Sequence, residues 1–181
     1  MMTDKAVDML ADIEAVIFDM DGTLVDSMWI WPIVDEEYMK KYGIEAPEGF
    51  HELMEGMSYT ESAQLFVDTF PEASFNIEDV KQEWMDMVYE KYTTVVKLKP
   101  GAKEFIQALR AKGVKIGIAT SNTRELVEAT LEALGISELF DSVRTSCEAG
   151  AGKPEPDVYL LVAEELGVNP EACLVFEDVP M

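Results

Sequence analysis

The sequence contains few of the residues that build disulfide frameworks or zinc sites. It has two cysteines, Cys147 and Cys173, without a CxxC spacing, and a single histidine. Secreted disulfide scaffolds use several closely spaced cysteines, and structural zinc sites use about four cysteine or histidine ligands. Both classes are therefore excluded, and two free thiols favour a reducing cytoplasm.

Basic residues are scarce as well. The chain has 14 lysines and arginines against 36 aspartates and glutamates, for a formal net charge of -22. This field repels nucleic acid and anionic membrane surfaces, so neither is an expected partner. It also repels phosphorylated metabolites, so a phosphate site would need a divalent cation, a lysine and backbone amides close by.

Long apolar runs are missing. The first fourteen residues include Asp4, Asp8, Asp12 and Glu14, and so lack the basic start and unbroken apolar stretch of a signal peptide. No later segment approaches the length of a transmembrane helix. We therefore expect a cytoplasmic protein that does not enter the membrane.

What the chain does have is an alternation of strand-like and helix-like segments. Residues 15–19, 115–120 and 173–177 are short and almost wholly apolar, as strands buried on both faces of a parallel sheet are. Helical patterns follow at residues 102–109, 123–134 and about 156–166, and a glycine closes each of them. The order predicts an α/β fold with a doubly wound parallel sheet.

Residues 28–97 interrupt this alternation, because they show helical patterns and no convincing buried strand. Ser58 and Glu61 predict a capping box, and Asn76 precedes a long amphipathic run. We predict an inserted α-helical cap domain at 28–97 and a discontinuous core domain at 1–27 and 98–181. Four cap aromatic residues either line a substrate slot or pack the cap itself: Trp29, Trp31, Tyr38 and Tyr59.

Two carboxylates end the first predicted strand. Asp19 and Asp21 are followed by Gly22, which lets the chain turn at the carboxyl edge of the sheet, where open α/β sheets bind ligands. One carboxylate is then placed to attack while the other handles protons. The alternative is an ordinary Asp-Gly turn with two solvated acids.

The other two predicted strands also end in polar residues. After the second come Thr120, Ser121 and Asn122, which offer hydroxyls and amides for an anion, although Asn122 with Glu125 is also a plausible capping box. The third delivers Glu177 and Asp178, which suit a hard cation with oxygen ligands.

Between them, Lys153 is the only basic residue after Arg144. A lone lysine in an acidic stretch is either a surface charge or a partner for an anion. Together, the four segments supply a nucleophile, an acid, a cation ligand, a lysine and hydroxyls on one expected rim.

These four motifs, in this order, resemble those of the haloacid dehalogenase superfamily. The motifs are residues 19–24, Thr120, Lys153 and Glu177-Asp178, and an insertion directly after the first resembles the helical cap of the β-phosphoglucomutase-like branch. The resemblance covers the chain from Glu14 onward and implies a Rossmann-like core and a magnesium-dependent phosphatase of a small phosphorylated metabolite.

The resemblance also implies a role for each residue. Asp19 would attack phosphorus to form an aspartyl-phosphate, and Asp21 would protonate the leaving oxygen and then activate water. Mg²⁺ would be held by Asp19, the backbone carbonyl of Asp21 and Asp178, with Glu177 in support. The phosphoryl oxygens would be bound by Thr120, Ser121, Asn122 and Lys153.

The chain departs from the mutases of this branch in its cap. Those enzymes carry a histidine twelve residues after the nucleophile and a cap arginine that holds a second phosphate. Here Trp31 takes the first position, Tyr59 lies near the second, and residues 22–98 contain no arginine. Hydrolysis is therefore favoured over the alternative of a sugar phosphomutase. A second alternative, a non-catalytic phosphoacceptor module, would not require Asp21 and a long insertion.

The fold of this family normally continues beyond the fourth motif with a helix and at least one more strand. Because Met181 follows Asp178 by three residues, we expect a core truncated at its C-terminus and weak metal binding by the 181-residue chain. The sequence leaves the substrate and the oligomeric state open.

Overall fold

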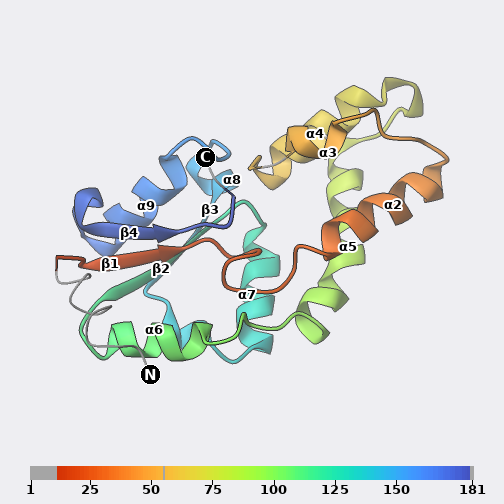
Figure 1. Cartoon of the computed structure of the whole chain (residues 1–181). Coiled ribbons are helices and arrows are strands. Elements are labelled where there is room, and N and C mark those ends of the chain that lie inside the picture. Colours follow the sequence, from red (N-terminus) through yellow and green to blue (C-terminus); the bar gives the residue numbers. More distant parts are fainter. Residues whose placement is uncertain (1–11, 55, 180–181) are drawn as a thin grey trace.

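A four-stranded parallel sheet forms the centre of the molecule (Figure 1). The computed structural model describes residues 12–54 and 56–179. The strands are β1 (Ala15–Phe18), β2 (Lys115–Thr120), β3 (Ser142–Thr145) and β4 (Cys173–Phe176), in the spatial order β3-β2-β1-β4. The predicted parallel α/β fold is confirmed, and β1 and β2 lie at the centre of the sheet.

Helices cover both faces of the sheet. Alternate side chains of β1 accordingly pack into two different apolar clusters. Val16 and Phe18 join the larger cluster, which includes residues of α6 (Ala102–Arg110) and α7 (Arg124–Ala133). Ala15 and Ile17 join the smaller cluster under α9 (Asp157–Leu166). This alternation is the period of two that strand geometry imposes.

One glycine in β2 permits the close approach of α9. A Cβ atom on Gly117 would lie 2.4 Å from Cγ1 of Val162, well inside van der Waals contact. The absence of a side chain at this position lets α9 pack directly against the strand.

The strand β3 did not emerge from the sequence pattern. Three of its four residues, in the sequence Ser-Val-Arg-Thr, are polar, and it lies at one edge of the sheet with β2 as its neighbour. An edge strand accepts charged and hydroxyl side chains, so it lacks the apolar signal of the buried strands.

Between β1 and α6 the described residues form four α-helices, which lie to one side of the sheet in Figure 1. These are α2 (Ile30–Tyr42), α3 (Phe50–Met54), α4 (Tyr59–Thr69) and α5 (Ile77–Thr94). The predicted capping box of Ser58 and Glu61 begins α4, and Asn76 caps α5 through the N–H groups of Glu78 and Asp79. Across the part of the chain that the structure describes, no helix is both long and apolar enough to cross a bilayer.

The inserted helices share the larger apolar cluster with the sheet, so the two predicted domains have a continuous core. Their boundaries at 28–97 remain a prediction. Two chain segments connect the insertion to the core, and an isolated antiparallel bridge between Val25 and Leu98 joins them. Backbone hydrogen bonds from Asp26 to Lys97 and from Lys99 to Leu24 flank this bridge.

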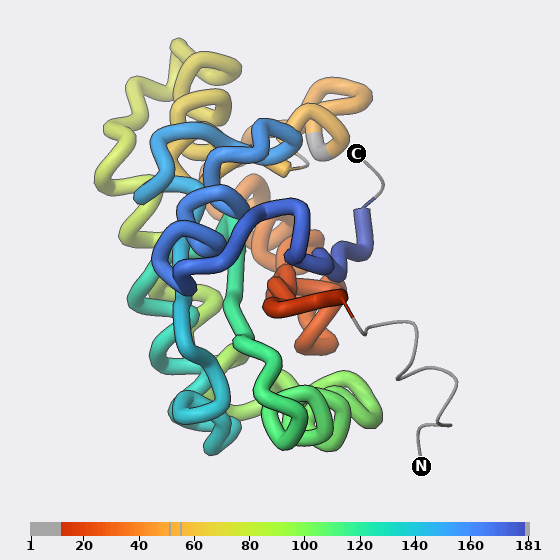
Figure 2. The backbone as a smooth tube through the Cα atoms, turned by 90° about the vertical axis from the view of Figure 1, so that its left-hand side faces the viewer, coloured from red at the N-terminus to blue at the C-terminus, as the bar shows by residue number. Residues whose placement is uncertain are grey.

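A second attachment lies between α3 and α4, at Gly56. The backbone N–H of Lys153 donates to the carbonyl of Gly56 over 2.8 Å, and the N–H of Tyr59 donates to the carbonyl of Ser121 over 3.1 Å. Figure 2 shows from another side the start of α4 (yellow) beside the blue segment before α9. The helical insertion is therefore bonded to the core domain where it begins and ends, and again through the residues between α3 and α4.

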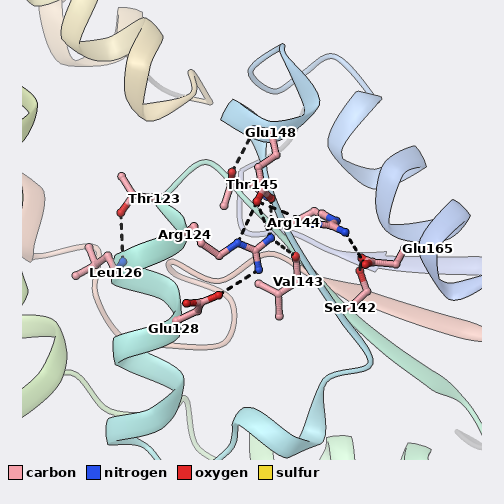
Figure 3. Close-up of polar contacts among 10 residues, drawn as sticks. All are labelled: Thr123, Arg124, Leu126, Glu128, Ser142, Val143, Arg144, Thr145, Glu148 and Glu165. Carbon is pink, nitrogen blue, oxygen red and sulfur yellow. Dashed lines mark hydrogen bonds and ion pairs between the residues drawn. The ribbon is translucent and has the colours of Figure 1, made fainter. Parts of the chain in front are cut away.

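An ion-pair network ties the edge strand to its surroundings (Figure 3). Arg124, at the start of α7, donates from Nη2 to both carboxylate oxygens of Glu148 over 2.7 and 2.8 Å and to the carbonyl of Val143. Arg144 pairs with Glu165 of α9 over 2.5 Å. Glu148 lies in α8 (Ser146–Ala149), where its carboxylate also completes the capping box with Thr145.

We predict that Glu148→Gln lowers stability in a pH-dependent way. Burial raises the pKa of Glu148, but hydrogen bonds from Arg124 and Thr145 outweigh it and leave the pKa below the ordinary 4.5. Because the pKa is lower in the folded state, the stabilisation is present at neutral pH and is lost as the pH falls below 4.5. We expect a loss of about 1 kcal/mol or less at pH 7, measured by urea unfolding, because the pair is partly exposed.

The control is Glu128→Gln, which removes a more exposed carboxylate 3.6 Å from the same arginine. We expect it to leave stability unchanged at every pH. A Glu148→Gln deficit that persists undiminished at acidic pH would contradict the electrostatic account.

Candidate active site

Asp19 and Lys153 form a buried ion pair at the carboxyl end of β1. Asp19 is the residue after β1, and its backbone N–H donates to the carbonyl of Phe176 on the neighbouring strand. The Lys153 Nζ atom lies 2.6 Å from Oδ1 of Asp19 and 2.7 Å from Oε1 of Glu177. Asp19 is 6% exposed and Lys153 is 5% exposed, so bulk water screens this contact only weakly.

The charges of this cluster depend on one another. Burial lowers the pKa of Lys153, but the carboxylates of Asp19 and Glu177 outweigh burial and hold it above its ordinary value, so Lys153 is cationic. Burial raises the pKa of Asp19 well above its usual range, and the charge of Lys153 opposes that rise. Any further cation near Asp19 would favour its ionised form, which is the form that attacks an electrophile.

Glu177 is held between two donors. Its Oε1 atom accepts from Lys153 and, over 3.0 Å, from the hydroxyl of Tyr159. The Nζ atom of Lys153 also lies 5.2 Å from the centre of the Tyr159 ring. These contacts fix the ammonium group in front of Asp19.

Asp21 lies on the other side of Asp19, where the chain turns away from the strand. Gly22 adopts a φ of 77°, a left-handed conformation that a residue with a side chain rarely occupies. The Asp21 carboxylate accepts three hydrogen bonds, from Ser27 over 2.6 Å, from Tyr92 over 2.5 Å and from Asn122 over 3.1 Å.

The segment after β2 is joined to both sides of the site. Thr120 is buried, and its Oγ1 accepts the backbone N–H of Asn122 over 3.1 Å. Ser121 donates to the carbonyl of Gly56 over 3.1 Å. The alternative capping box of Asn122 with Glu125 is wrong, because Thr123 caps α7 and Asn122 contacts Asp21 instead.

Three carboxylates meet at the open end of the cluster. Oxygen atoms of Asp19, Glu177 and Asp178 lie within 4.8 Å of one another. Burial, together with the charges of Glu177 and Asp21, raises the pKa of Asp178. The Oε2 atom of Glu177 is buried and finds no hydrogen-bond partner among the described residues. Clustered oxygen ligands, mutual repulsion and an orphaned acceptor fit a hard divalent cation such as Mg²⁺.

These side chains line one cavity of about 430 Å³ between the sheet and the inserted helices. It contains every residue that the sequence predicted for the site: Asp19, Asp21, Thr120, Ser121, Asn122, Lys153, Glu177 and Asp178. The structure thus brings the predicted set together, while the individual roles remain predictions.

The opposite wall of the cavity is mainly aromatic and methionine-rich. Trp31, Tyr59 and Trp84 line it, together with Met54 and Met57. Trp29, by contrast, is 40% exposed and Tyr38 is buried in the apolar cluster, and neither lines the cavity. The predicted aromatic group is therefore divided between the wall and the rest of the insertion.

Among the described residues, Ser27, Tyr92 and Tyr159 donate side-chain hydrogen bonds to predicted site residues and were not found from the sequence. Tyr92 continues the buried stripe of Trp84 and Val88 along α5, so the pattern favours a core residue. The one available signal was chemical, since a buried tyrosine hydroxyl requires a hydrogen-bond partner.

Comparisons with known proteins agree on one family. A family model for haloacid dehalogenase-like hydrolases matches residues 13–180. The chain is 32% identical over 168 residues to a phosphorylated carbohydrates phosphatase of Thermotoga maritima, covering 91% of this chain and 76% of that protein. It is also 32% identical over 169 residues to hexitol phosphatase A of Escherichia coli, covering 91% of this chain and 74% of the relative.

Solved structures show the same arrangement. A β-phosphoglucomutase from Clostridium difficile matches with a TM-score of 0.79 at 26% identity, covering 92% of this chain and 77% of that one. A structure from Thermotoga maritima, solved as a putative β-phosphoglucomutase, matches with a TM-score of 0.66 at 30% identity, covering 92% of this chain and 77% of that one.

We predict that Gly22→Ala weakens divalent-cation binding by about tenfold or more, as loss of support for a metal ligand does. A Cβ atom at this position would lie 1.9 Å from Oδ2 of Asp178, so the carboxylate must move. The measurement is titration calorimetry with Mg²⁺.

Gly101→Ala is the matched control. Gly101 also has a left-handed φ, of 84°, but a Cβ atom there would meet nothing within 4 Å. Both variants carry similar backbone strain, and only Gly22→Ala displaces Asp178. Equal affinities for the two variants would contradict the assignment of Asp178 to the cation site.

Proposed function

The chain belongs to the haloacid dehalogenase-like hydrolases and is therefore an enzyme, and we propose that it is a magnesium-dependent phosphatase of a phosphorylated carbohydrate or sugar alcohol. The family predicted from the sequence is confirmed by the match over residues 13–180. Relatives named as phosphatases of phosphorylated carbohydrates and hexitols support the substrate class. The observation that carries the proposal is the buried pair of Asp19 and Lys153 facing the cavity.

Asp19 is the proposed nucleophile. A carboxylate oxygen of Asp19 attacks phosphorus, the bond from phosphorus to the leaving oxygen breaks, and an aspartyl-phosphate forms. Lys153 is positioned beside Asp19 to offset repulsion between the carboxylate and the incoming anion. Thr120, Ser121 and Asn122 complete the proposed set of donors for the phosphoryl oxygens.

Asp21 is the proposed acid and base. It gives a proton to the leaving oxygen in the first step. In the second step it takes a proton from water, whose oxygen attacks phosphorus and releases phosphate from Asp19. Asp21 lines the same cavity as Asp19 and, two residues beyond it, is held by three hydrogen bonds.

The proposed metal ligands are Asp19, the backbone carbonyl of Asp21, and Asp178, with Glu177 in support. When bound there, Mg²⁺ would supply positive charge to the phosphoryl oxygens. The orphaned oxygen of Glu177 and the clustered carboxylates support this set.

Hydrolysis is preferred over a mutase reaction because of the cavity wall. Lys153 is the sole lysine or arginine among the described residues that line the cavity, and it is already paired with two carboxylates. Asp35 and Glu52 contribute further negative charge to the lining. A second phosphate on the substrate therefore meets repulsion instead of a binding cation, which disfavours a bisphosphate intermediate.

The two unpaired thiols, Cys147 and Cys173, support a reducing location such as the cytoplasm. The net charge of -22 argues against nucleic acid and anionic membranes as partners.

We predict that Asp19→Asn abolishes phosphate release, with a loss of about a thousandfold or more, because an amide oxygen is a poor nucleophile. The assay follows phosphate release from a hexitol phosphate with Mg²⁺, and again with a chelator, which we expect to stop turnover reversibly. Asp26→Asn is the control, since Asp26 is an exposed aspartate in the same loop that does not line the cavity. Retained turnover in Asp19→Asn would refute the proposed mechanism.

We predict that a monophosphate with a neutral leaving group reacts at least about tenfold faster, in kcat/KM, than a bisphosphate or phosphoglycolate. Asp35→Asn removes a negative charge from the cavity wall. We expect it to reduce the ratio of the two kcat/KM values roughly threefold, as for one partly screened charge. Glu36→Gln, which alters an exposed neighbour on α2 outside the cavity, leaves the ratio unchanged. Equal rates for neutral and anionic leaving groups would show that wall charge does not select the substrate.

A further inference from the structure

The carboxylate of Asp21 is joined to the inserted helices by a chain of hydrogen bonds. The Trp31 Nε1–H of α2 donates to the Tyr92 hydroxyl of α5 over 3.0 Å, and this hydroxyl donates to Oδ1 of Asp21 over 2.5 Å. Ser27 donates to the same oxygen over 2.6 Å, and Asn122 donates to Oδ2 over 3.1 Å.

The direction of each bond is determined by chemistry. An indole nitrogen is a donor only, so the oxygen of Tyr92 accepts from Trp31, and its single proton is left for Asp21. The amide of Asn122 is oriented in the same way, because its Oδ1 accepts the backbone N–H of Thr123 over 2.8 Å. Its NH₂ group therefore faces Asp21, and the carboxylate is an acceptor in all three bonds.

Burial preserves this arrangement. Tyr92 is 0% exposed, and Ser27 and Asn122 are also buried. Burial, followed by the charge of Asp21, raises the pKa of Tyr92 well above its usual value, so the hydroxyl keeps its proton. Bonds of this kind, shielded from water, hold a carboxylate in one rotamer.

We propose that Tyr92 is a positioning residue for the acid-base step: its hydroxyl, oriented by Trp31, holds Asp21 in place from the inserted helices. The proposal rests on the proposed function, because it assumes that Asp21 transfers a proton to the leaving oxygen. It assigns to α5 and α2 a part in proton transfer in addition to forming the cavity wall.

The test uses Tyr92→Phe, which removes the hydroxyl and keeps the ring. The leaving group of a hexitol phosphate is an alkoxide, which needs a proton. The leaving group of p-nitrophenyl phosphate is a stable phenolate, which needs none. Complete loss of a general acid costs about 10²- to 10⁴-fold, so a misplaced one is expected to cost about tenfold. We expect kcat/KM to fall about tenfold for the hexitol phosphate and less than about threefold for p-nitrophenyl phosphate, with KM unchanged for both.

A double-mutant cycle separates positioning from packing. If Tyr92 acts through Asp21, then Tyr92→Phe has no further effect on either substrate in an Asp21→Asn background. Tyr89→Phe, an exposed tyrosine one turn earlier on α5, is the control and leaves both rates unchanged. An equal fall with both substrates, or an undiminished fall in the Asp21→Asn background, overturns the proposal.

Trp31→Phe keeps the inference testable if Tyr92→Phe fails to fold. It removes the donor that orients the hydroxyl and also changes the cavity wall. A loss shared by both substrates reports the wall, and we expect a further loss of about threefold confined to the hexitol phosphate. Equal losses with both substrates would again overturn the proposal. A wild-type protein that releases phosphate from neither substrate would instead refute the proposed function itself.

Discussion

The site depends on one ammonium group placed among carboxylates. Lys153 contacts Asp19 and Glu177 at 2.6 and 2.7 Å with almost no solvent access, in a chain whose net charge is -22. Asp19 is buried and Glu177 is half-buried, and two such carboxylates without a cation between them would take up protons or move apart. Removing the lysine alone would leave both charges uncompensated, which costs far more than the pair contributes when complete. The geometry of the rim therefore depends on this side chain more than on any other contact.

The register of the sheet explains why these groups meet. Phe18 of β1 pairs with Phe176 of β4 in parallel, so the next residues, Asp19 and Glu177, emerge side by side at the same edge. On the other side of β1, Phe18 pairs with Ile118, so Thr120 ends β2 two positions further along the same edge. Asp19 and Glu177 lie more than 150 positions apart in sequence. The parallel pairing of the strands, and not an attraction between the two side chains, brings them together.

This logic also separates what the sequence predicts from what it does not. Buried strands such as 15–18 and 115–120 are recognisable because both faces are apolar, and Ser58 and Asn76 cap helices through local contacts that a short pattern contains. The edge strand β3 has no such signal. For Asn122 the local pattern allowed a helix cap, and the structure instead places its side chain against Asp21, 101 positions away. Contacts made across the fold, such as the one from Tyr92, depend on helix placement that local patterns do not encode.

The insertion and the sheet consequently form one functional unit. The same helices that supply the aromatic wall, through Trp31 and Trp84, also supply the hydroxyl of Tyr92 that contacts Asp21. Trp31 belongs to both groups, since it lines the cavity and donates to Tyr92. A substitution that reshapes the wall at Trp31 therefore also alters the support of Asp21. The shape of the wall and the support of Asp21 are therefore coupled through a single side chain, Trp31.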